Sequence, residues 1–210
     1  MKSALIVVGL VAAVASPAFA TIRITEVMSS SGSGGTADWI EVTNYGTSAV
    51  DITGWKMDDN SFSFANSVAL LGISTLGAGE TVIFFEGAAG DVAGFRNFWG
   101  GLSGVQVGFY SGSGVSFGSS GDAAVLFNGS GAEASNRASF GAASSGKSFY
   151  FDTGSDTGIV SVVGTIGTQV TFATTGVPVN TGSLGTAIGV PAPGALALLA
   201  VAGIAGRRSR

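Results

Sequence analysis

Acidic side chains are the residues of this sequence with the clearest potential for chemistry. The chain has 210 residues, among them thirteen Asp and Glu, and it contains neither histidine nor cysteine. These absences exclude Ser-His-Asp and Cys-His nucleophile systems and the ordinary ligands of zinc, copper and haem. Two kinds of chemistry remain, namely hydrolysis by paired carboxylates and the binding of a hard cation such as calcium.

A glycosidase needs two carboxyl groups facing each other across a sugar. The acidic residues considered for such a pair are Glu26, Glu41, Asp58, Asp59, Glu86 and Asp91. Their spacing places no two of them in that arrangement, and acids in turns and at strand edges are usually solvated. We therefore expect solvated acids and a protein that is not an enzyme, with a carboxylate-based hydrolase as an alternative.

The best cluster of oxygen ligands for calcium is Asp58, Asp59 and Asn60, in an expected turn. These residues lack the D-x-[DN]-x-[DN]-G spacing of a calcium-binding loop. The sequence therefore predicts no cofactor, and calcium at this turn is the alternative.

The charge distribution argues against nucleic-acid binding. Between residues 21 and 189 there are thirteen acidic and five basic side chains, which gives a net charge of −8. A nucleic-acid-binding surface needs a basic face to neutralise phosphates. An acidic body of this kind is compatible with solubility and with cation binding.

Alternating apolar and polar residues predict short strands separated by turns rich in Gly, Ser, Asn and Asp. Strands are expected within residues 21–28, 38–44, 49–53, 61–71, 81–85, 105–110, 115–117, 122–127, 137–140 and 147–151. One stretch, residues 91–99, is typical of a short helix. Short strands at this spacing predict an antiparallel sandwich or barrel.

Aromatic side chains are the expected filling of that sandwich, because they carry the largest apolar area per residue. Nine Trp and Phe residues lie between residues 39 and 99. The pair Phe62 and Phe64 is spaced to share one face of a strand. An exposed Trp99 or Tyr110 would instead provide a platform on which a carbohydrate could stack.

Five segments, in this order, resemble the lamin tail domain family. They are residues 22–27 (IRITEV), 38–44 (DWIEVTN), 50–57 (VDITGWKM), 76–84 (LGAGETVIF) and 121–127 (GDAAVLF). The resemblance implies an all-β, immunoglobulin-like antiparallel sandwich that is not an enzyme. In the paired DWIEVTN and VDITGWKM segments, Gly54 permits a bend and Trp55 is expected in the core.

The resemblance gives a domain organisation. We expect the sandwich to cover residues 21–152 and to be followed by residues 153–189. That second stretch contains one or two possible extra strands at 159–172 and a neutral Gly- and Thr-rich linker at 174–189.

The first twenty residues have the pattern of a secretory signal peptide. Lys2 precedes an apolar run at residues 4–15, and Ala18 and Ala20 are the small residues of a cleavage site. Signal peptidase is expected to cleave after Ala20, which makes Thr21 the first mature residue. The alternative is an uncleaved anchor, although the apolar run is shorter than the roughly 20 residues of a membrane span.

The last twenty-one residues resemble the bacterial PEP-CTERM sorting signal, although Ala192 stands where that family usually has glutamate. An apolar stretch at residues 194–206 spans about 20 Å as a helix, which is short for a bilayer core of about 30 Å. The basic tip is expected to stay on the cytoplasmic side. The predicted sorting residues are Val190, Pro191, Ala192, Pro193, Arg207, Arg208 and Arg210.

This second resemblance implies transient insertion of the tail into the inner membrane and processing by an exosortase. A simple weak membrane anchor is the alternative. Together, the two ends predict an exported protein of a Gram-negative-type bacterium, located in the envelope or the extracellular polymer matrix. Its expected role is structural or adhesive, with exopolysaccharide or other surface proteins as partners, and a polysaccharide-binding module is the alternative.

Overall fold

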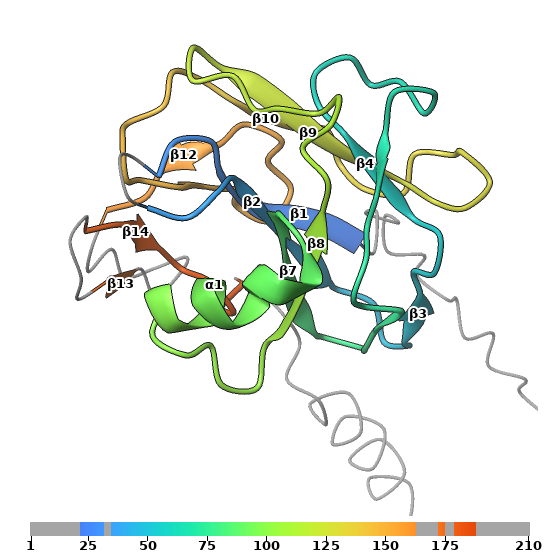
Figure 1. The fold of residues 1–210 in the computed structure, drawn as a ribbon. Coiled ribbons are helices and arrows are strands. Elements are labelled where there is room, and N and C mark those ends of the chain that lie inside the picture. The colour runs from blue at the N-terminus through green and yellow to red at the C-terminus, as the bar shows by residue number, and fades with distance from the viewer. Residues whose placement is uncertain (1–21, 32–34, 163–171, 175–178, 188–210) are drawn as a thin grey trace, which may run out of the picture.

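The computed structural model describes residues 22–31, 35–162, 172–174 and 179–187, which form a sandwich of two sheets with a helix against one of them (Figure 1). The first sheet has the order β12 (Ile159–Val160), β11 (Phe149–Tyr150), β1 (Ile22–Met28), β2 (Trp39–Asn44), β7 (Thr81–Glu86) and β8 (Gln106–Tyr110). The second has the order β10 (Ala138–Phe140), β9 (Asp122–Phe127), β4 (Lys56–Asp58) and β5 (Val68–Ala69).

Smaller elements complete the fold. Strand β3 (Val50–Asp51) pairs with β6 (Thr75–Leu76), and β13 (Phe172–Ala173) pairs with β14 (Thr181–Gly182). A 3₁₀ turn, η1 (Ala89–Asp91), leads into helix α1 (Val92–Phe98). The all-β sandwich predicted from the sequence is confirmed, as is the short helix within residues 91–99.

The main hydrophobic core lies between the two sheets. It is built from alternate residues of the long strands, such as Ile24 and Val27 of β1, Ile40 and Val42 of β2, and Leu126 of β9. This is the inward alternation that a two-sheet sandwich requires. Neighbouring strands are antiparallel throughout both sheets except for β7 and β8, which run parallel because η1 and α1 connect them across the outer face.

A second hydrophobic core lies on the outer face of the six-stranded sheet, where α1 covers β2 and β7. Trp39 and Ile83 of these strands pack with Phe95 and Trp99 at the helix. The Trp39 and Trp99 rings meet edge to face with their centroids 5.5 Å apart. Both faces of this sheet are therefore buried, and helix, six-stranded sheet and four-stranded sheet form three layers (Figure 1).

An irregularity in β1 decides which of its residues face outward. Ile24 is opposite Val42 and Glu26 is opposite Glu41, so Thr25 is the extra residue of a β-bulge. Ile24 and Val27 both belong to the core between the sheets, whereas Thr25 and Glu26 contact residues on the outer face. The bulge thus places Thr25 and Glu26 side by side on the same face.

Two sequence predictions of strands are wrong. Residues 61–67 form turns, with φ of 47° at Phe62, and only β5 is a strand within residues 61–71. Phe62 and Phe64 therefore do not share a strand face. Residues 115–117 form no strand either, although Val115 and Phe117 are buried in the core between the sheets. The alternation of apolar residues in this segment reflects burial of their side chains and not pairing of the backbone with another strand.

The two residues expected to shape the VDITGWKM segment behave as predicted. Gly54 has φ of 75°, a conformation that favours glycine, and Trp55 is buried in the main core with 8% of its surface exposed. At the end of β2, the side-chain amide of Asn44 donates to the carbonyl groups of Ser48, Leu76 and Gly77. Asn44 thereby satisfies backbone groups that strand pairing leaves open.

Part of the stretch that its composition predicts to be a linker is packed against the sandwich. Within residues 174–189, strand β14 and residues 183–185 lie on the outer face of the six-stranded sheet, where Leu184 joins the second core. Side chains of this stretch are buried because they meet polar partners on β1 and β2. In the described part of the chain, no helix has the length and apolar character that crossing a membrane requires.

Candidate functional site

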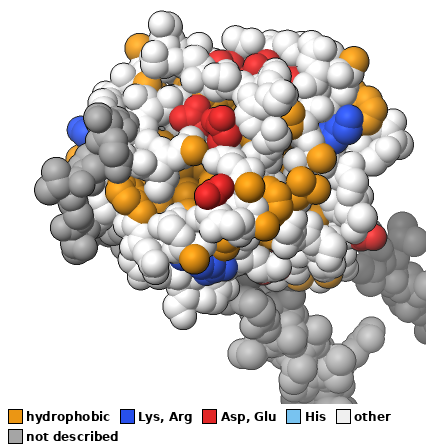
Figure 2. Space-filling view, in the orientation of Figure 1, with side chains coloured by type: hydrophobic (Ala, Val, Ile, Leu, Met, Phe, Trp, Pro, Cys, Tyr) orange, Lys and Arg blue, Asp and Glu red, His pale blue; other side chains and the backbone are white. Residues whose placement is uncertain are grey.

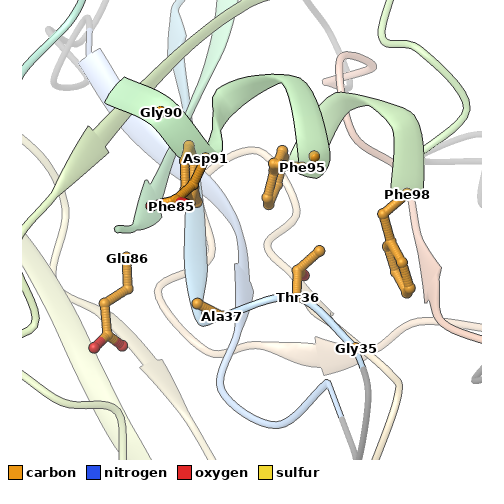
Figure 3. A pocket seen from close by; sticks show the side chains of 10 residues that line it. Gly35, Thr36, Ala37, Phe85, Glu86, Gly90, Asp91, Phe95 and Phe98 are labelled. Atoms are coloured by element: carbon orange, nitrogen blue, oxygen red, sulfur yellow. The ribbon is translucent and has the colours of Figure 1, made fainter. Parts of the chain in front are cut away.

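A groove of about 510 Å³ opens between α1 and the loop that precedes β2. The loop contributes Gly35, Thr36 and Ala37 to its lining, and β7 contributes Phe85 and Glu86 at its end. The η1 turn and α1 complete the lining with Gly90, Asp91, Gly94, Phe95 and Phe98. Figure 3 shows Phe95 and Phe98 pointing from the helix toward the loop, with Glu86 at one end of the groove.

Aromatic packing fixes the walls of this groove. The rings of Phe85 and Phe95 are stacked with their centroids 4.7 Å apart, and Phe98 meets Trp99 edge to face at 5.6 Å. The indole N–H of Trp99 donates to Thr36 Oγ1 at 3.4 Å, which ties the loop to the end of the helix. Phe98 is only half-buried, so part of its ring is available to a ligand.

Two glycines keep the groove open. Gly90 and Gly94 lie one helical turn apart, and a Cβ atom at either position would meet nothing within 4 Å. Neither has the positive φ that favours glycine, so neither backbone nor packing requires a glycine at these positions. Glycine within a helix costs about 1 kcal/mol relative to alanine. These glycines therefore lower the stability of the fold at positions where larger side chains would fill the groove.

Acidic groups gather at the end of the groove formed by β7 and η1. The backbone N–H of Ala88 donates to Asp91 Oδ2 at 3.0 Å, which holds this carboxylate at the start of the helix. Burial and the neighbouring Glu86 carboxylate raise the pKa of Asp38 to about 6. In the space-filling view, acidic and hydrophobic side chains lie side by side near the middle of this face (Figure 2). The groove thus combines phenyl rings with carboxylates.

A second group of acids lies under the C-terminal part of the described chain. Glu26 and Glu41 are opposite each other on β1 and β2, and neither side chain is exposed. Burial raises the pKa of Glu26 to about 7, although hydrogen bonds from Ser148 and Ser183 lower it. Burial and the nearby Glu26 raise the pKa of Glu41 to about 8. The prediction that these two acids are solvated is wrong, because residues 183–185 cover them.

The residues considered for calcium binding, Asp58, Asp59 and Asn60, form hydrogen bonds that shape their own turn. Asp58 is buried, and its Oδ2 accepts hydrogen bonds from Ser61 Oγ and from the Ser63 amide, both at 2.6 Å. Asp59 accepts from the Ser61 amide at 3.0 Å, and the backbone N–H of Asn60 donates to Asp122. Among the residues that the structure describes, no three Asp, Glu, His or Cys side chains are grouped so that they could hold a metal ion.

The aromatic residues considered for carbohydrate stacking are in the wrong place for it. Trp99 is 2% exposed because it packs in the second core beside α1, and Tyr110 is 1% exposed because it lies in the main core between the sheets. Phe98, at the rim of the groove, is the aromatic residue that occupies the position expected of Trp99. Gly94, a glycine inside the predicted helix at residues 91–99, is the sequence signal that marks this groove.

The predicted signal-cleavage residues Ala18, Ala20 and Thr21 lie outside the described residues. The same is true of the sorting residues, which are Val190, Pro191, Ala192, Pro193, Arg207, Arg208 and Arg210.

The fold and the site together define a class of protein, an immunoglobulin-like β-sandwich with a helix-covered outer face and an open groove beside the helix. The family to which this chain belongs is the lamin tail domain family, whose model matches residues 15–143. Comparisons with curated proteins and with solved structures find no match. The family membership agrees with a β-sandwich domain that is not an enzyme.

Proposed function

We propose that this chain is an exported, non-enzymatic sandwich protein with a structural or adhesive role in the bacterial envelope or extracellular polymer matrix. The observation that carries the proposal is that the fold uses several of its acidic side chains in its own structure. Glu26 and Glu41 are covered, Asp58 orders a turn, and Glu133 pairs with Arg137 at 2.6 Å on the surface. Acids held in this way support a scaffold.

The exported location rests on the two ends of the sequence. The signal-peptide pattern ending at Ala20 supports passage through signal peptidase, and the VPAP motif at residues 190–193 supports processing by an exosortase. Arg207, Arg208 and Arg210 would hold the tail tip at the cytoplasmic side while the tail is inserted in the membrane. Surface proteins and exopolysaccharide are the partners that this location offers.

Intact mass spectrometry of the protein from cells and from the medium tests both processing events together. We expect a mature species that begins at Thr21 and lacks the residues from the sorting segment onward. A dominant species that still contains Arg210 would contradict tail processing and would favour a simple anchor. A species that still contains Met1 would contradict cleavage after Ala20.

Polysaccharide binding is a second candidate function, and the groove beside α1 favours it. Sugar rings have apolar faces that pack on aromatic rings and hydroxyl groups that bond to carboxylates. Phe98 offers a partly exposed ring, while Glu86 and Asp91 offer carboxylates in the same groove. The open space at Gly90 and Gly94 lets a ligand approach the helix backbone closely.

The variant Gly94→Leu separates binding from stability. A leucine at this position fills the groove, so we expect the affinity for the best polysaccharide to fall at least about tenfold, or about 1.4 kcal/mol. The same change removes a helical glycine, so the melting temperature should stay equal or rise. Retention on immobilised cellulose, chitin, xylan and alginate would identify the polysaccharide and measure the loss.

The matched control is Ala93→Leu, which adds the same bulk at the neighbouring exposed position of α1, outside the groove lining. This control should bind like the wild type. Equal retention of the Gly94→Leu variant and the control would contradict binding in the groove. Release of new reducing ends from any of the polysaccharides would contradict the non-enzymatic role.

A further inference from the structure

The last described segment of the chain closes over the buried pair Glu26 and Glu41, called here the acid pair. Residues 180–185, called here the clasp, include β14 and lie outside the region matched by the lamin tail domain model. In Figure 1, β13 and β14 lie at the side of the sandwich near α1. The clasp is anchored to neighbouring chain by bonds from the Thr181 amide to the Gly146 carbonyl, 2.7 Å, and from the Ser148 amide to the Thr181 carbonyl, 3.1 Å.

The clasp holds both members of the acid pair directly. The Ser183 amide donates to Glu26 Oε1 at 2.8 Å, and the Ser183 hydroxyl donates to Glu26 Oε2 at 2.7 Å. The Gly185 amide donates to Glu41 Oε2 at 2.6 Å. One segment thus caps two carboxyl groups that lie 157 and 144 positions earlier in the chain.

The clasp packs closely over the acid pair. A Cβ atom on Gly182 would come within 2.8 Å of Leu184 Cδ1 and 3.0 Å of Glu26 Oε1, so a larger residue there would have to displace these side chains. Leu184 is 4% exposed in the second hydrophobic core. The clasp therefore shields the acid pair from water on the outer face of the sheet.

No cation among the described residues neutralises the acid pair. The charged or titratable side chains on the packed elements around it are Arg23, Tyr45, Arg96, Lys147 and Tyr150, and the clasp itself carries none. Arg96 of α1 donates to the carbonyl groups of Leu102 and Val105. Arg23 is bonded to Asp156 at 2.9 Å, and Lys147 is exposed. Two buried carboxylates without a cation repel each other and lack hydration, so the closed arrangement requires a proton.

The hydrogen bonds around the pair suit a proton better than a metal ion. Each of the four carboxyl oxygens accepts a bond from an amide or a hydroxyl, since Ser148 also donates to Glu26 Oε1 and Thr25 donates to Glu41 Oε1 at 2.7 Å. Amide hydrogens aimed at these oxygens would repel a cation. Hydroxyl groups, in contrast, can reverse their bonds and accept from a protonated carboxyl.

We propose that residues 180–185 are a proton-dependent clasp, closed while the Glu26 and Glu41 pair holds at least one proton and released when both side chains ionise. Release hydrates the carboxylates and frees the segment that precedes the predicted sorting residues. The connection between the sandwich and the sorting segment then gains the six residues of the clasp, up to about 20 Å of extended chain. Alkaline conditions thus lengthen the tether of the sandwich, whereas neutral to acidic conditions shorten it.

Hydrogen exchange of the full chain, followed by mass spectrometry at pH values from 6 to 9, tests this proposal. After correction for the intrinsic exchange rate, we expect peptides covering residues 180–187 to lose protection at least tenfold between pH 6.5 and 8.5. The reference is β9 in the other sheet, which should stay more protected than the clasp at every pH, because the clasp opens while the sandwich remains folded. In the double variant E26Q/E41Q, which mimics the protonated pair, the clasp should stay protected at every pH.

The matched control E133Q removes an exposed carboxylate on the other side of the sandwich and should behave like the wild type. Equal protection of the clasp and β9 in the wild type at pH 8.5 would overturn the proposal, because it would assign the loss to global unfolding. So would an unchanged loss in the double variant, or clasp protection that depends on added calcium and not on pH. If the double variant does not fold, S183A provides the test, since removing one donor should release the clasp at lower pH; wild-type behaviour of S183A would overturn the proposal.

Discussion

Replacing Trp55 with alanine is expected to unfold the sandwich. Trp55 is buried between the sheets at the turn from β3 to β4, and its backbone carbonyl accepts a bond from the Leu70 amide at 3.0 Å. Truncation of a buried tryptophan costs about 3–5 kcal/mol. A domain of this kind has a total stability of about 5–15 kcal/mol, so a loss of this size removes a large part of it and unfolds a domain at the lower end of that range.

Urea denaturation followed by tryptophan fluorescence and circular dichroism measures this loss. Trp55→Phe keeps most of the apolar volume and should cost less than half as much as the alanine variant. The matched surface control is Phe64→Ala, because Phe64 is 36% exposed and meets Phe127 edge to face from a turn. A Trp55→Ala variant with the wild-type urea midpoint would show that Trp55 is not a core residue.

The sandwich was predictable because its signals are local. The alternation in residues 38–44 assigns Ile40 and Val42 to one face and Glu41 to the other, and the structure has this arrangement. The bend at Gly54 and the core position of Trp55 follow from residue types within a few positions. Side-chain alternation and turn chemistry depend on neighbouring residues, and one sequence displays both.

The environment of the outer face was not predictable in the same way. Alternation places Glu41 opposite the main core, which for a two-layer sandwich means exposure to water. Here α1 and the clasp cover that face, and the clasp residue Gly185 lies 144 positions from Glu41. A polar residue on the outer face of a strand carries no information about a covering segment so distant in the chain. The prediction of solvated acids fails for this reason.

The groove was missed because its two walls come from distant segments. Thr36 and Trp99, which are bonded to each other, are 63 positions apart. The sequence expects Trp99 in the core and gives an exposed Trp99 only as the alternative, and the helix turns Trp99 inward and leaves Phe98 at the rim. Helical periodicity assigns residues to faces of α1, but only the packed structure shows which face meets the sheet.

The acid pair is expected to make the folded state less stable as the pH rises. Glu26 and Glu41 have pKa values of about 7 and 8 in the folded protein, against 4.5 for an ordinary glutamate. The folded state therefore holds protons that the unfolded state has already lost above pH 4.5. The sign follows directly, since unfolding then releases protons and higher pH favours it. Stability is full below about pH 4.5, falls up to about pH 8 and then levels off.

Asp38, with a pKa of about 6, adds to the loss of stability only below about that pH. At higher pH its carboxyl group is already ionised in the folded state. The range from pH 6.5 to 8.5 thus reports on the acid pair. We expect the free energy of unfolding to fall there by about 3 kcal/mol, since each unit between folded and unfolded pKa values corresponds to about 1.4 kcal/mol. Urea denaturation at fixed ionic strength and several pH values provides the measurement.

In the E26Q/E41Q variant, the free energy of unfolding should no longer decrease above pH 6.5. The decrease below pH 6.5, which Asp38 causes, should remain. The change is expected because glutamine supplies a neutral amide whose oxygen accepts from the Ser183 and Gly185 amides, and whose NH₂ group donates to neighbouring hydroxyls. A flat wild-type profile between pH 6.5 and 8.5 would contradict the protonated state of the pair. A slope that persists in the double variant would assign the titration to other groups.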